Sequence, residues 1–428
     1  MDDWQAPPPF LSRVTVGAVV FEDDRAAALA DDEFADAMVR PDYGGYCFSG
    51  VPAAAADRVG VDLGEGLPED AFGAGHENPA HVVVLFVDSL GYRQFERVAE
   101  DVPFLQAFRD SGQVTPLTST YPSETAACVT TMATATDPVE HGVLGWNAYD
   151  PEADTVYEVL PYAAKDGGEI SVRPDDLFDV EPIYPRLREA GVDPHVVGPD
   201  YGPGYDDAAT AGATAHHYER TTEFALALRD VIRGADAPSY TYAYYPFVDA
   251  AAHEYGPGSD EADAQAAAVG DALERALGSL DDAVAEETLV CLVADHGQVD
   301  VSETTVDLAG TGVLEHVQTD RSGAPLALGG PRNLHLRVTD ETAARECLAD
   351  LDAVVLGRDE ALDAGLWGRG EPGPAFDRNA GDLLVIPRDA MLLPTRDDGE
   401  WGLAGMHGGL NPREAIVPFG VAWASALA

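Results

Sequence analysis

The sequence predicts an α/β fold in which a mostly parallel central sheet lies between helices and carries a small α+β insertion. Short runs of apolar and β-branched residues, typical of buried parallel strands, alternate with stretches of helical spacing. The chain has 428 residues, which is too long for one small domain. From about residue 316 the alternation changes to shorter units, as expected of an inserted piece.

The elements follow in chain order. Core strands are expected at 81–88, 193–200, 239–249 and 287–297, and helices at 89–101, 181–191, 221–234 and 260–285. The shorter units lie at 333–338, 341–351, 353–357 and 381–387, and a last core strand is expected within 405–424. We therefore divide the chain into four parts: an N-terminal lead that packs on the core (1–78), a catalytic α/β core (79–315), an inserted α+β cap (316–404) and a final core segment (405–428).

The charge of the chain is extreme. Twenty-five basic residues stand against 76 acidic ones, the formal net charge is −51, and Lys165 is the only lysine. Apolar residues make up 46% of the chain, which excludes a disordered acidic protein and is typical of a folded protein from an extreme halophile. Such a surface argues against binding to duplex nucleic acid, and an anionic substrate would need bound divalent cations.

The start of the chain, MDDWQAPPPF, has acidic residues where a signal peptide needs basic ones. No run of about 18 apolar residues occurs, so we expect a cytoplasmic protein with no membrane partner. The four cysteines are far apart and form no CxxC pair, which argues against both a cysteine metal site and a disulfide framework. They are Cys47, Cys128, Cys291 and Cys347.

Acidic residues stand where three of the predicted strands end, and histidines accompany them. The aspartates are Asp88, Asp249 and Asp295. The histidines are His253, four residues after Asp249, His296, next to Asp295, and His407, in the glycine-rich GMHGG. Ligands gather at the carboxyl ends of strands in open α/β sheets, and carboxylate oxygens with imidazole nitrogens suit zinc, manganese or iron. The set predicts a metal site there.

The stretch TYPSETAACVTT places the hydroxyls of Ser123 and Thr125 just after a proline. By itself this pattern is typical of a capped helix start. Beside two metal ions, however, a hydroxyl at a helix N-terminus is also well placed to act as a nucleophile on a phosphate ester. Both interpretations stay open at the level of residue types.

Six motifs occur in an order and at spacings that point to a known family. They are FVD at Asp88, PSET at Thr125, EHGV at His141, VDAAAHEYGP at Asp249 and His253, ADHG at Asp295 and His296, and MHGG at His407. Over residues 81–410 the chain thereby resembles the alkaline phosphatase superfamily, and within it the nucleotide pyrophosphatase/phosphodiesterase branch. The resemblance does not cover the N-terminal lead.

The resemblance implies an alkaline phosphatase-like fold and two divalent metal ions, with Zn²⁺ as the first choice and Mn²⁺ or Fe²⁺ as alternatives. One site would use Asp249, His253 and His407, and the other Asp88, Asp295, His296 and the Thr125 hydroxyl. In the family this hydroxyl attacks phosphorus and forms a phospho-enzyme that water hydrolyses. Thr125 matches better than Ser123, since it keeps the family's interval of sixteen residues to His141. Asn147 resembles the asparagine that stabilises the phosphoryl charge.

The resemblance also implies a small phosphate-ester substrate, such as a nucleotide, and hydrolysis of phosphodiester or pyrophosphate bonds. Ala126, Ala127 and Cys128 replace the family's aromatic residue and Asn-His pair, so a stacking ring would have to come from elsewhere, with Tyr244 as a candidate if it is not simply a core residue. Cys128 also lacks the sulfatase pattern. Alternatives are a phosphomonoesterase or phosphomutase on the same fold, which could use Lys165 for phosphate, and a degraded binding module.

Overall fold

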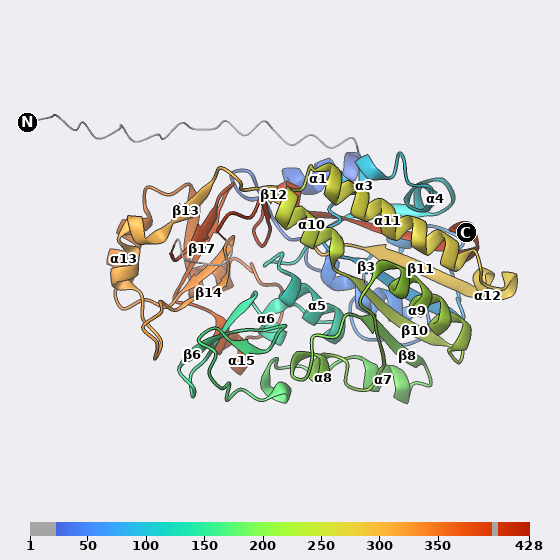
Figure 1. Cartoon of the computed structure of the whole chain (residues 1–428), viewed down its shortest axis with the longest axis horizontal. Coiled ribbons are helices and arrows are strands. Elements are labelled where there is room, and N and C mark those ends of the chain that lie inside the picture. The colour runs from blue at the N-terminus through green and yellow to red at the C-terminus, as the bar shows by residue number, and fades with distance from the viewer. Residues whose placement is uncertain (1–22, 396–400) are drawn as a thin grey trace, which may run out of the picture.

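A seven-stranded sheet forms the centre of the molecule, which the computed structural model describes over residues 23–395 and 401–428 (Figure 1). The strand order is β4-β20-β11-β3-β10-β8-β9. The strands are β3 (His81–Val87), β4 (Gln113–Thr118), β8 (Asp193–Gly198), β9 (Thr214–His217), β10 (Ser239–Tyr245), β11 (Thr288–Val293) and β20 (Ile416–Trp423). β20 runs antiparallel to both of its neighbours, and the other adjacent pairs are parallel. The predicted mostly parallel sheet is confirmed.

Burial explains why these residues form strands. Every residue of β3, HVVVLFV, is buried, and the same holds for β10 and β11 on either side of it. Strands covered on both faces read as continuous apolar runs, which is the pattern visible in the sequence. The predicted last core strand is also found, as β20.

Helices flank the sheet, and α11 (Asp260–Leu277) packs against both α4 (Pro103–Ser111) and α9 (Thr221–Gly234). A second group consists of α2 (Val51–Asp57), α5 (Thr125–Thr134) and α8 (Tyr205–Ala209). The other helices are α1 (Asp24–Asp31), α3 (Tyr92–Val98), α6 (Pro138–His141), α7 (Tyr184–Glu189), α10 (Phe247–Tyr255), α12 (Asp282–Glu287), α13 (Glu341–Leu348), α14 (Arg358–Asp363), α15 (Pro374–Asn379) and α16 (Pro412–Ala415). Within the described residues, none of these helices combines the length and the apolar character needed to cross a bilayer.

A second seven-stranded sheet, antiparallel throughout, lies beside the first, at the left of Figure 1. Its order is β16-β17-β15-β14-β5-β6-β7. Its strands are β5 (Asn147–Asp150), β6 (Thr155–Glu158), β7 (Ala163–Ala164), β14 (Ala327–Gly330), β15 (Asn333–Leu336), β16 (Ala353–Gly357) and β17 (Leu383–Pro387). The short units expected after residue 332 are therefore present, and strands from 147–164 complete their sheet.

Short strands pair with one another outside the two large sheets. They are β1 (Glu33–Ala35), β2 (Met38–Val39), β12 (Val299–Asp300), β13 (Thr305–Asp307), β18 (Met391–Leu393) and β19 (Gly405–Met406). β12 pairs with β19, and β13 pairs with β18. The residues around β12 and β19 therefore lie side by side although about a hundred positions separate them in the sequence.

A buried ion pair joins the second sheet to the core. Arg332, in the turn between β14 and β15, donates from Nε and Nη2 to the two carboxylate oxygens of Glu414 at 2.8 and 2.6 Å. Neither side chain is exposed to solvent. The guanidinium also donates to the backbone oxygens of Ala390 and Arg388. Glu414 belongs to α16, which leads directly into β20, so the pair fixes the second sheet to the last core strand.

Candidate active site

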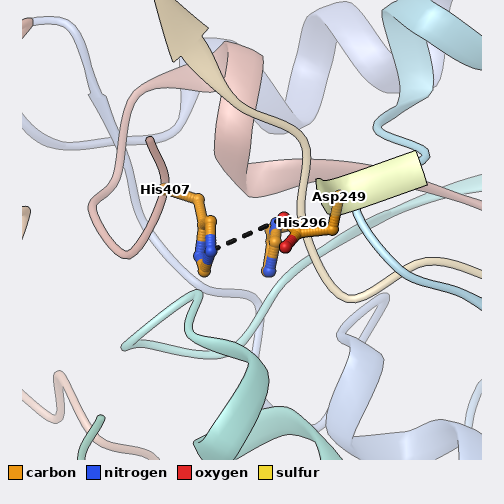
Figure 2. A group of neighbouring side chains, drawn as sticks. All are labelled: Asp249, His296 and His407. Atoms are coloured by element: carbon orange, nitrogen blue, oxygen red, sulfur yellow. Dashed lines mark ion pairs between the residues drawn. The ribbon is translucent and has the colours of Figure 1, made fainter. Parts of the chain in front are cut away.

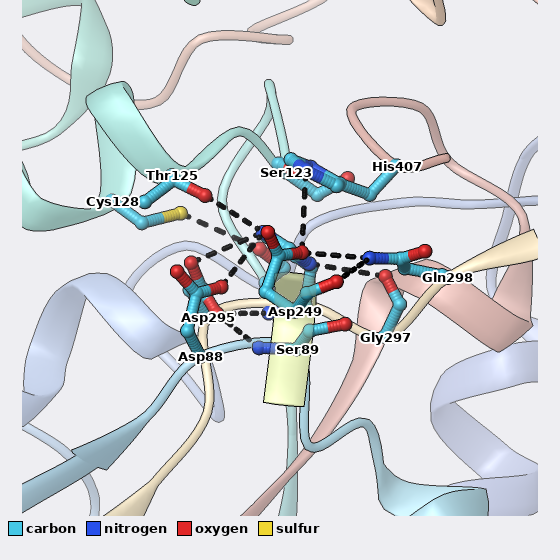
Figure 3. Close-up of polar contacts among 12 residues, drawn as sticks. Asp88, Ser89, Ser123, Thr125, Cys128, Asp249, Asp295, Gly297, Gln298 and His407 are labelled. Carbon is cyan, nitrogen blue, oxygen red and sulfur yellow. Dashed lines mark hydrogen bonds and ion pairs between the residues drawn. The ribbon is translucent and has the colours of Figure 1, made fainter. Parts of the chain in front are cut away.

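Three neighbouring parallel strands deliver the predicted aspartates to one edge of the central sheet. Asp88 follows β3 directly, Asp295 follows β11 by two residues, and Asp249 lies in the first turn of α10, just after β10. The order β11-β3-β10 places the three strand ends next to one another. The backbone N–H of Asp88 donates to Tyr245 O at 3.0 Å, so the β3–β10 ladder extends to this aspartate. All three carboxylates meet in the space that Figure 3 shows.

Thr125 reaches the same space as the first residue of the buried helix α5. Its Oγ1 lies 3.2 Å from Nε2 of His296. Ser123, two residues earlier, has a different role, because its Oγ donates to Gly409 O at 2.8 Å and its backbone forms a bridge with Gly408. The turn that presents Thr125 is thus tied to the loop that carries His407.

The three predicted histidines share one arrangement. In each ring Nδ1 lies 2.8–3.1 Å from a backbone carbonyl oxygen, which can only accept a hydrogen bond. The rings are those of His253 (to Gly405), His296 (to Gly297) and His407 (to Ser123). Nδ1 therefore carries the hydrogen, and Nε2 is free to act as a ligand. Metal-binding histidines in proteins are oriented in this way.

The Nε2 atoms face the carboxylates. That of His296 lies 3.1 Å from Asp295 Oδ2 and 3.4 Å from Asp88 Oδ1. On the other side, Asp249 Oδ2 lies 3.2 Å from Nε2 of His253, and Oδ1 lies 3.7 Å from Nε2 of His407. The rings of His296 and His407 stack with their centroids 3.6 Å apart, as seen in Figure 2.

Burial and crowding of like charges perturb these groups strongly. Burial, together with the carboxylates of Asp295 and Asp249, raises the pKa of Asp88 well above its usual value. Burial acts in the same direction on Asp249, but His253, His407 and His296 outweigh it and lower the pKa of that carboxyl. Burial and the neighbouring His296 hold the pKa of His407 well below its ordinary value. The carboxyl groups of the site thus lie close together in a mostly buried place, where burial disfavours their charged forms.

Two groups of potential ligand atoms lie close enough to hold an ion each within the described residues: Asp88, Asp295 and His296, and Asp249, His296 and His407. Asp88 Oδ1 and Asp295 Oδ2 are buried, and neither accepts a hydrogen bond from the described part of the chain. Buried carboxylate oxygens without a donor are costly unless a cation compensates them. The site therefore fits divalent ions, and its oxygen and nitrogen ligands suit zinc, manganese or iron.

Two side chains that the sequence did not single out as metal-site residues hold the aspartates in place. The hydroxyl of Tyr244 donates to Asp88 Oδ2 at 2.6 Å, and Nε2 of Gln298 donates to Asp249 Oδ1 at 2.7 Å. Tyr244 is buried in β10, where its ring packs against Phe86. It is a core residue, which is the second of the two interpretations given above. No sequence pattern marks Gln298, apart from its place three residues after Asp295.

The remaining predicted residues lie elsewhere. Asn147 is in β5, and its Nδ2 donates to Gly329 O at 3.1 Å rather than to a residue of the metal cluster, so its proposed contact with a phosphoryl group stays a prediction. Lys165 is exposed just after β7. His141 is buried, with Nδ1 accepting from Val143 N–H and Nε2 3.0 Å from the Thr131 hydroxyl, so it packs within the core.

Comparison with solved structures places the fold among known hydrolases. The chain is similar to murine ectonucleotide pyrophosphatase / phosphodiesterase 5, with 15% identity and a TM-score of 0.63 over 80% of this chain and 87% of that chain. An inactive threonine-to-alanine variant of the murine protein, in complex with AMP, gives 14% identity and a TM-score of 0.59 over 80% and 87%. Phosphonoacetate hydrolase from Sinorhizobium meliloti 1021, in complex with phosphonoformate, gives 19% identity and a TM-score of 0.55 over 80% of this chain and 89% of that chain.

The sequence matches none of the curated proteins with which it was compared. It does match a family described as type I phosphodiesterase / nucleotide pyrophosphatase, over residues 82–410. That span runs from β3 to the loop after His407 and includes every candidate ligand described above. The chain therefore belongs to the type I phosphodiesterase / nucleotide pyrophosphatase family and is a phosphoester hydrolase.

Proposed function

We propose that this protein hydrolyses a phosphodiester or pyrophosphate bond of a small phosphate ester, such as a nucleotide, with Thr125 as nucleophile and two divalent metal ions as cofactors. The observation that carries the proposal is the position of the Thr125 hydroxyl, 3.2 Å from Nε2 of His296, at the first turn of a buried helix and beside two buried aspartates, Asp88 and Asp295. Thr125 is not the N-cap of α5, which is Glu124, so a capping role does not account for its hydroxyl.

The proposed ligands are those that the family resemblance implies. Asp249, His253 and His407 would hold one ion, and Asp88, Asp295, His296 and Thr125 the other. When bound, the two ions supply Lewis-acid chemistry, since they neutralise phosphoryl oxygens and lower the pKa of a hydroxyl group. Zinc is the first choice on this ligand set, with manganese or iron as alternatives.

The residues of the chain divide the reaction into two displacements. Thr125 Oγ1 loses its proton and forms a bond to phosphorus, while the bond to the leaving oxygen breaks and that oxygen departs with the electron pair, so the phosphoryl group is held on the threonine. Water then forms the next bond to phosphorus, the bond to Oγ1 breaks, and the hydroxyl is restored. A phosphoryl group on Thr125 would lie at the N-terminus of α5, where the positive end of the helix would stabilise its negative charge.

The charge around the site favours a diester or a pyrophosphate over a monoester. In the described parts of the chain, no lysine or arginine forms an ion pair with Asp88, Asp249 or Asp295. Arg332, which is buried, is already paired with Glu414. A monoester dianion gains more from an additional cationic side chain than a diester anion does. The murine protein in complex with AMP supports a nucleotide as the kind of substrate.

The test compares bis(p-nitrophenyl) phosphate with p-nitrophenyl phosphate, in molar KCl with added zinc or manganese. We expect faster hydrolysis of the diester, and Thr125→Ala should lower the rate by about three orders of magnitude or more. Ser123→Ala is the matched control and should keep most of the activity, because its hydroxyl donates to Gly409 O instead of facing the metal cluster. Full activity of Thr125→Ala would refute the nucleophile, and a preference for the monoester would favour a phosphomonoesterase.

The setting in which the enzyme works is part of the proposal. The net charge of −51 supports a source whose cytoplasm contains molar salt. The four cysteines form no disulfide, and three of them are buried, which agrees with a reducing, cytoplasmic location.

A further inference from the structure

We propose that Tyr244 and Gln298 are positioning residues, and that each of them serves one of the two candidate metal sites. Tyr244 would fix Asp88 for the site that Asp295 and His296 share, and Gln298 would fix Asp249 for the site that contains His407. The proposal rests on the two-metal function proposed above. Neither residue would touch a metal ion or the substrate.

Tyr244 determines which oxygen of Asp88 is available. Its hydroxyl donates to Oδ2 at 2.6 Å, while Oδ1 faces Nε2 of His296 at 3.4 Å and accepts no hydrogen bond from the described residues. The tyrosine itself has little freedom. It is 4% exposed, its backbone pairs with Phe86 in the sheet, and its ring meets that of Phe86 edge-on at 5.2 Å. The carboxylate therefore keeps one orientation, with Oδ1 toward the cluster.

Gln298 fixes Asp249 in a comparable way from a different element. Nε2 donates to Asp249 Oδ1 at 2.7 Å and to the backbone oxygen of the same residue at 3.3 Å, as Figure 3 shows for the labelled pair. The glutamine is 4% exposed and directly precedes β12, whose pairing with β19 brings it beside His407. Asp249 is thereby held between His253 and His407.

The close approach of Gln298 depends on a glycine. A Cβ atom at Gly405 would lie 2.2 Å from Gln298 Oε1 and 2.5 Å from Ala252 O. The carbonyl of Gly405 also accepts the Nδ1 hydrogen of His253 at 2.8 Å. Bare backbone at this position thus brings the amide, α10 and β19 together around one carboxylate.

Both donors are uncharged, and this property suits the role. An arginine or lysine in their place would orient the aspartate but would also compensate its negative charge, which the metal ion needs. A neutral O–H or N–H group orients the carboxylate and leaves the charge in place. Tyr244 makes no hydrogen bond to Asp249 and Gln298 makes none to Asp88, so the loss of one donor should affect one site.

The experiment is a titration of metal-free protein with Zn²⁺ by isothermal calorimetry in molar KCl. The wild type should bind two ions in two steps. Tyr244→Phe should weaken one step by about 10- to 100-fold and leave the other unchanged, and Gln298→Leu should weaken the opposite step by a similar factor. His407→Ala and Asp295→Asn identify the steps. Gln298→Leu should therefore add nothing to the step already lost in His407→Ala.

Two variants serve as matched controls. Tyr242→Phe removes a buried hydroxyl two residues away on the same strand, one that has no hydrogen-bond partner in the described chain. Gln94→Leu removes a buried amide that donates to Asp263 Oδ1 at 3.1 Å, away from the cluster. Both should bind two ions like the wild type. The thermal midpoint of each variant in chelator shows whether it folds, and Tyr244→Phe should match Tyr242→Phe.

The outcomes separate the two proposals. A wild type that does not bind two metal ions would overturn the proposed function and this inference with it. A wild type with two sites, combined with variants in which both steps weaken equally or neither weakens, would overturn the inference alone. Opposite, site-specific losses would support it.

Discussion

The hydrogen on each histidine of the candidate site is fixed by the backbone and not by another side chain. Since a carbonyl oxygen accepts the Nδ1 hydrogen of His253, His296 and His407, each ring presents Nε2 to the carboxylates. The ring in the other tautomer would direct an N–H group toward the ion and would lose its bond to the backbone. Substitutions of nearby side chains should therefore leave these three rings in place, whereas changes to the rings themselves should remove a ligand.

Asp249→Ala and His407→Ala should each reduce the number of bound ions from two to one. Both side chains belong to the same proposed site, and Asp249 lies 3.2 and 3.7 Å from Nε2 of His253 and His407. Elemental analysis of dialysed protein measures the ratio directly. Two tightly held ions in either variant would exclude this group of residues as a metal site.

The buried His141 should make the stability of the protein depend on pH in the acid range. Burial lowers its pKa from the ordinary 6.5 to about 3, so between these values the unfolded chain binds a proton that the folded protein does not. The contribution of His141 to the free energy of unfolding should therefore be fully present above pH 6.5. Below that pH it should fall by about 1.4 kcal/mol for each pH unit. His141→Gln should reduce this slope by one proton in urea titrations between pH 4 and 6, and an unchanged slope would contradict the assignment. His217→Gln, at an exposed position, is the control.

At the scale of elements, α16 has two functions. It leads directly into the last core strand, β20, and it supplies Glu414 to the buried ion pair with Arg332. Asn411 caps this helix through its side chain, and Glu414 completes the capping box. The loop between His407 and α16 is thus fixed at its end by a charge pair and at its start by the β12–β19 bridge. The second sheet and the metal cluster are connected through this short segment.

Glu414→Gln should destabilise the protein by about 3–5 kcal/mol, because it leaves the guanidinium of Arg332 buried without an opposing charge. Denaturant unfolding in molar KCl measures the loss. Replacement of both partners, with Arg332→Met and Glu414→Leu, should recover much of it, since a buried ion pair adds little over well-packed apolar side chains. If the double variant were as unstable as Glu414→Gln, the loss would come from packing or capping and not from an unpaired charge.

The two sheets differ in how far the sequence predicts them. β3, β10 and β11 are continuous buried runs, and an aspartate follows each of them within four residues, so both their existence and the shared edge follow from local patterns. β5, β6 and β7 are short, and they join β14 at the single register pair Gly329 and Asn147. Nothing local indicates that residues near 147 and near 329 pair, because register between distant segments depends on the whole fold. The antiparallel direction of β20 likewise depends on the whole fold and is not visible in the local sequence.

The candidate site shows the same division. Aspartates and histidines at strand ends and in a glycine-rich loop have a recognisable chemistry, so the sequence predicted that they gather. Tyr244 and Gln298 have no such signal, because a buried tyrosine and a loop glutamine usually serve packing or solvation. Only the three-dimensional contacts, 2.6 Å to Asp88 and 2.7 Å to Asp249, distinguish them from other residues of their type.

For the molecule as a whole, the dominant property is its excess of 76 acidic over 25 basic residues. At low ionic strength these charges repel one another over long distances, and at 1 M salt the Debye length shortens to about 3 Å. Stability should therefore depend on salt more than on any single surface ion pair.

The thermal midpoint should rise steeply when KCl increases from about 0.1 M to above 1 M, as repulsion is screened. Scanning calorimetry across this range measures the effect. Sucrose at matched viscosity separates screening from general stabilisation, since it carries no charge. A midpoint that does not change with KCl would show that the excess charge is compensated within the fold.

The place of β20 has a consequence for synthesis on the ribosome. This strand lies inside the sheet, between β4 and β11, yet it begins at Ile416, 298 positions after β4 ends at Thr118.

 A nascent chain that already contains β3, β4, β10 and β11 therefore still lacks the strand that joins β4 to the others, and β11 keeps an open edge until β20 has left the exit tunnel. Chaperones that cover exposed strand edges should accordingly stay bound to this protein until β20 has emerged from the exit tunnel.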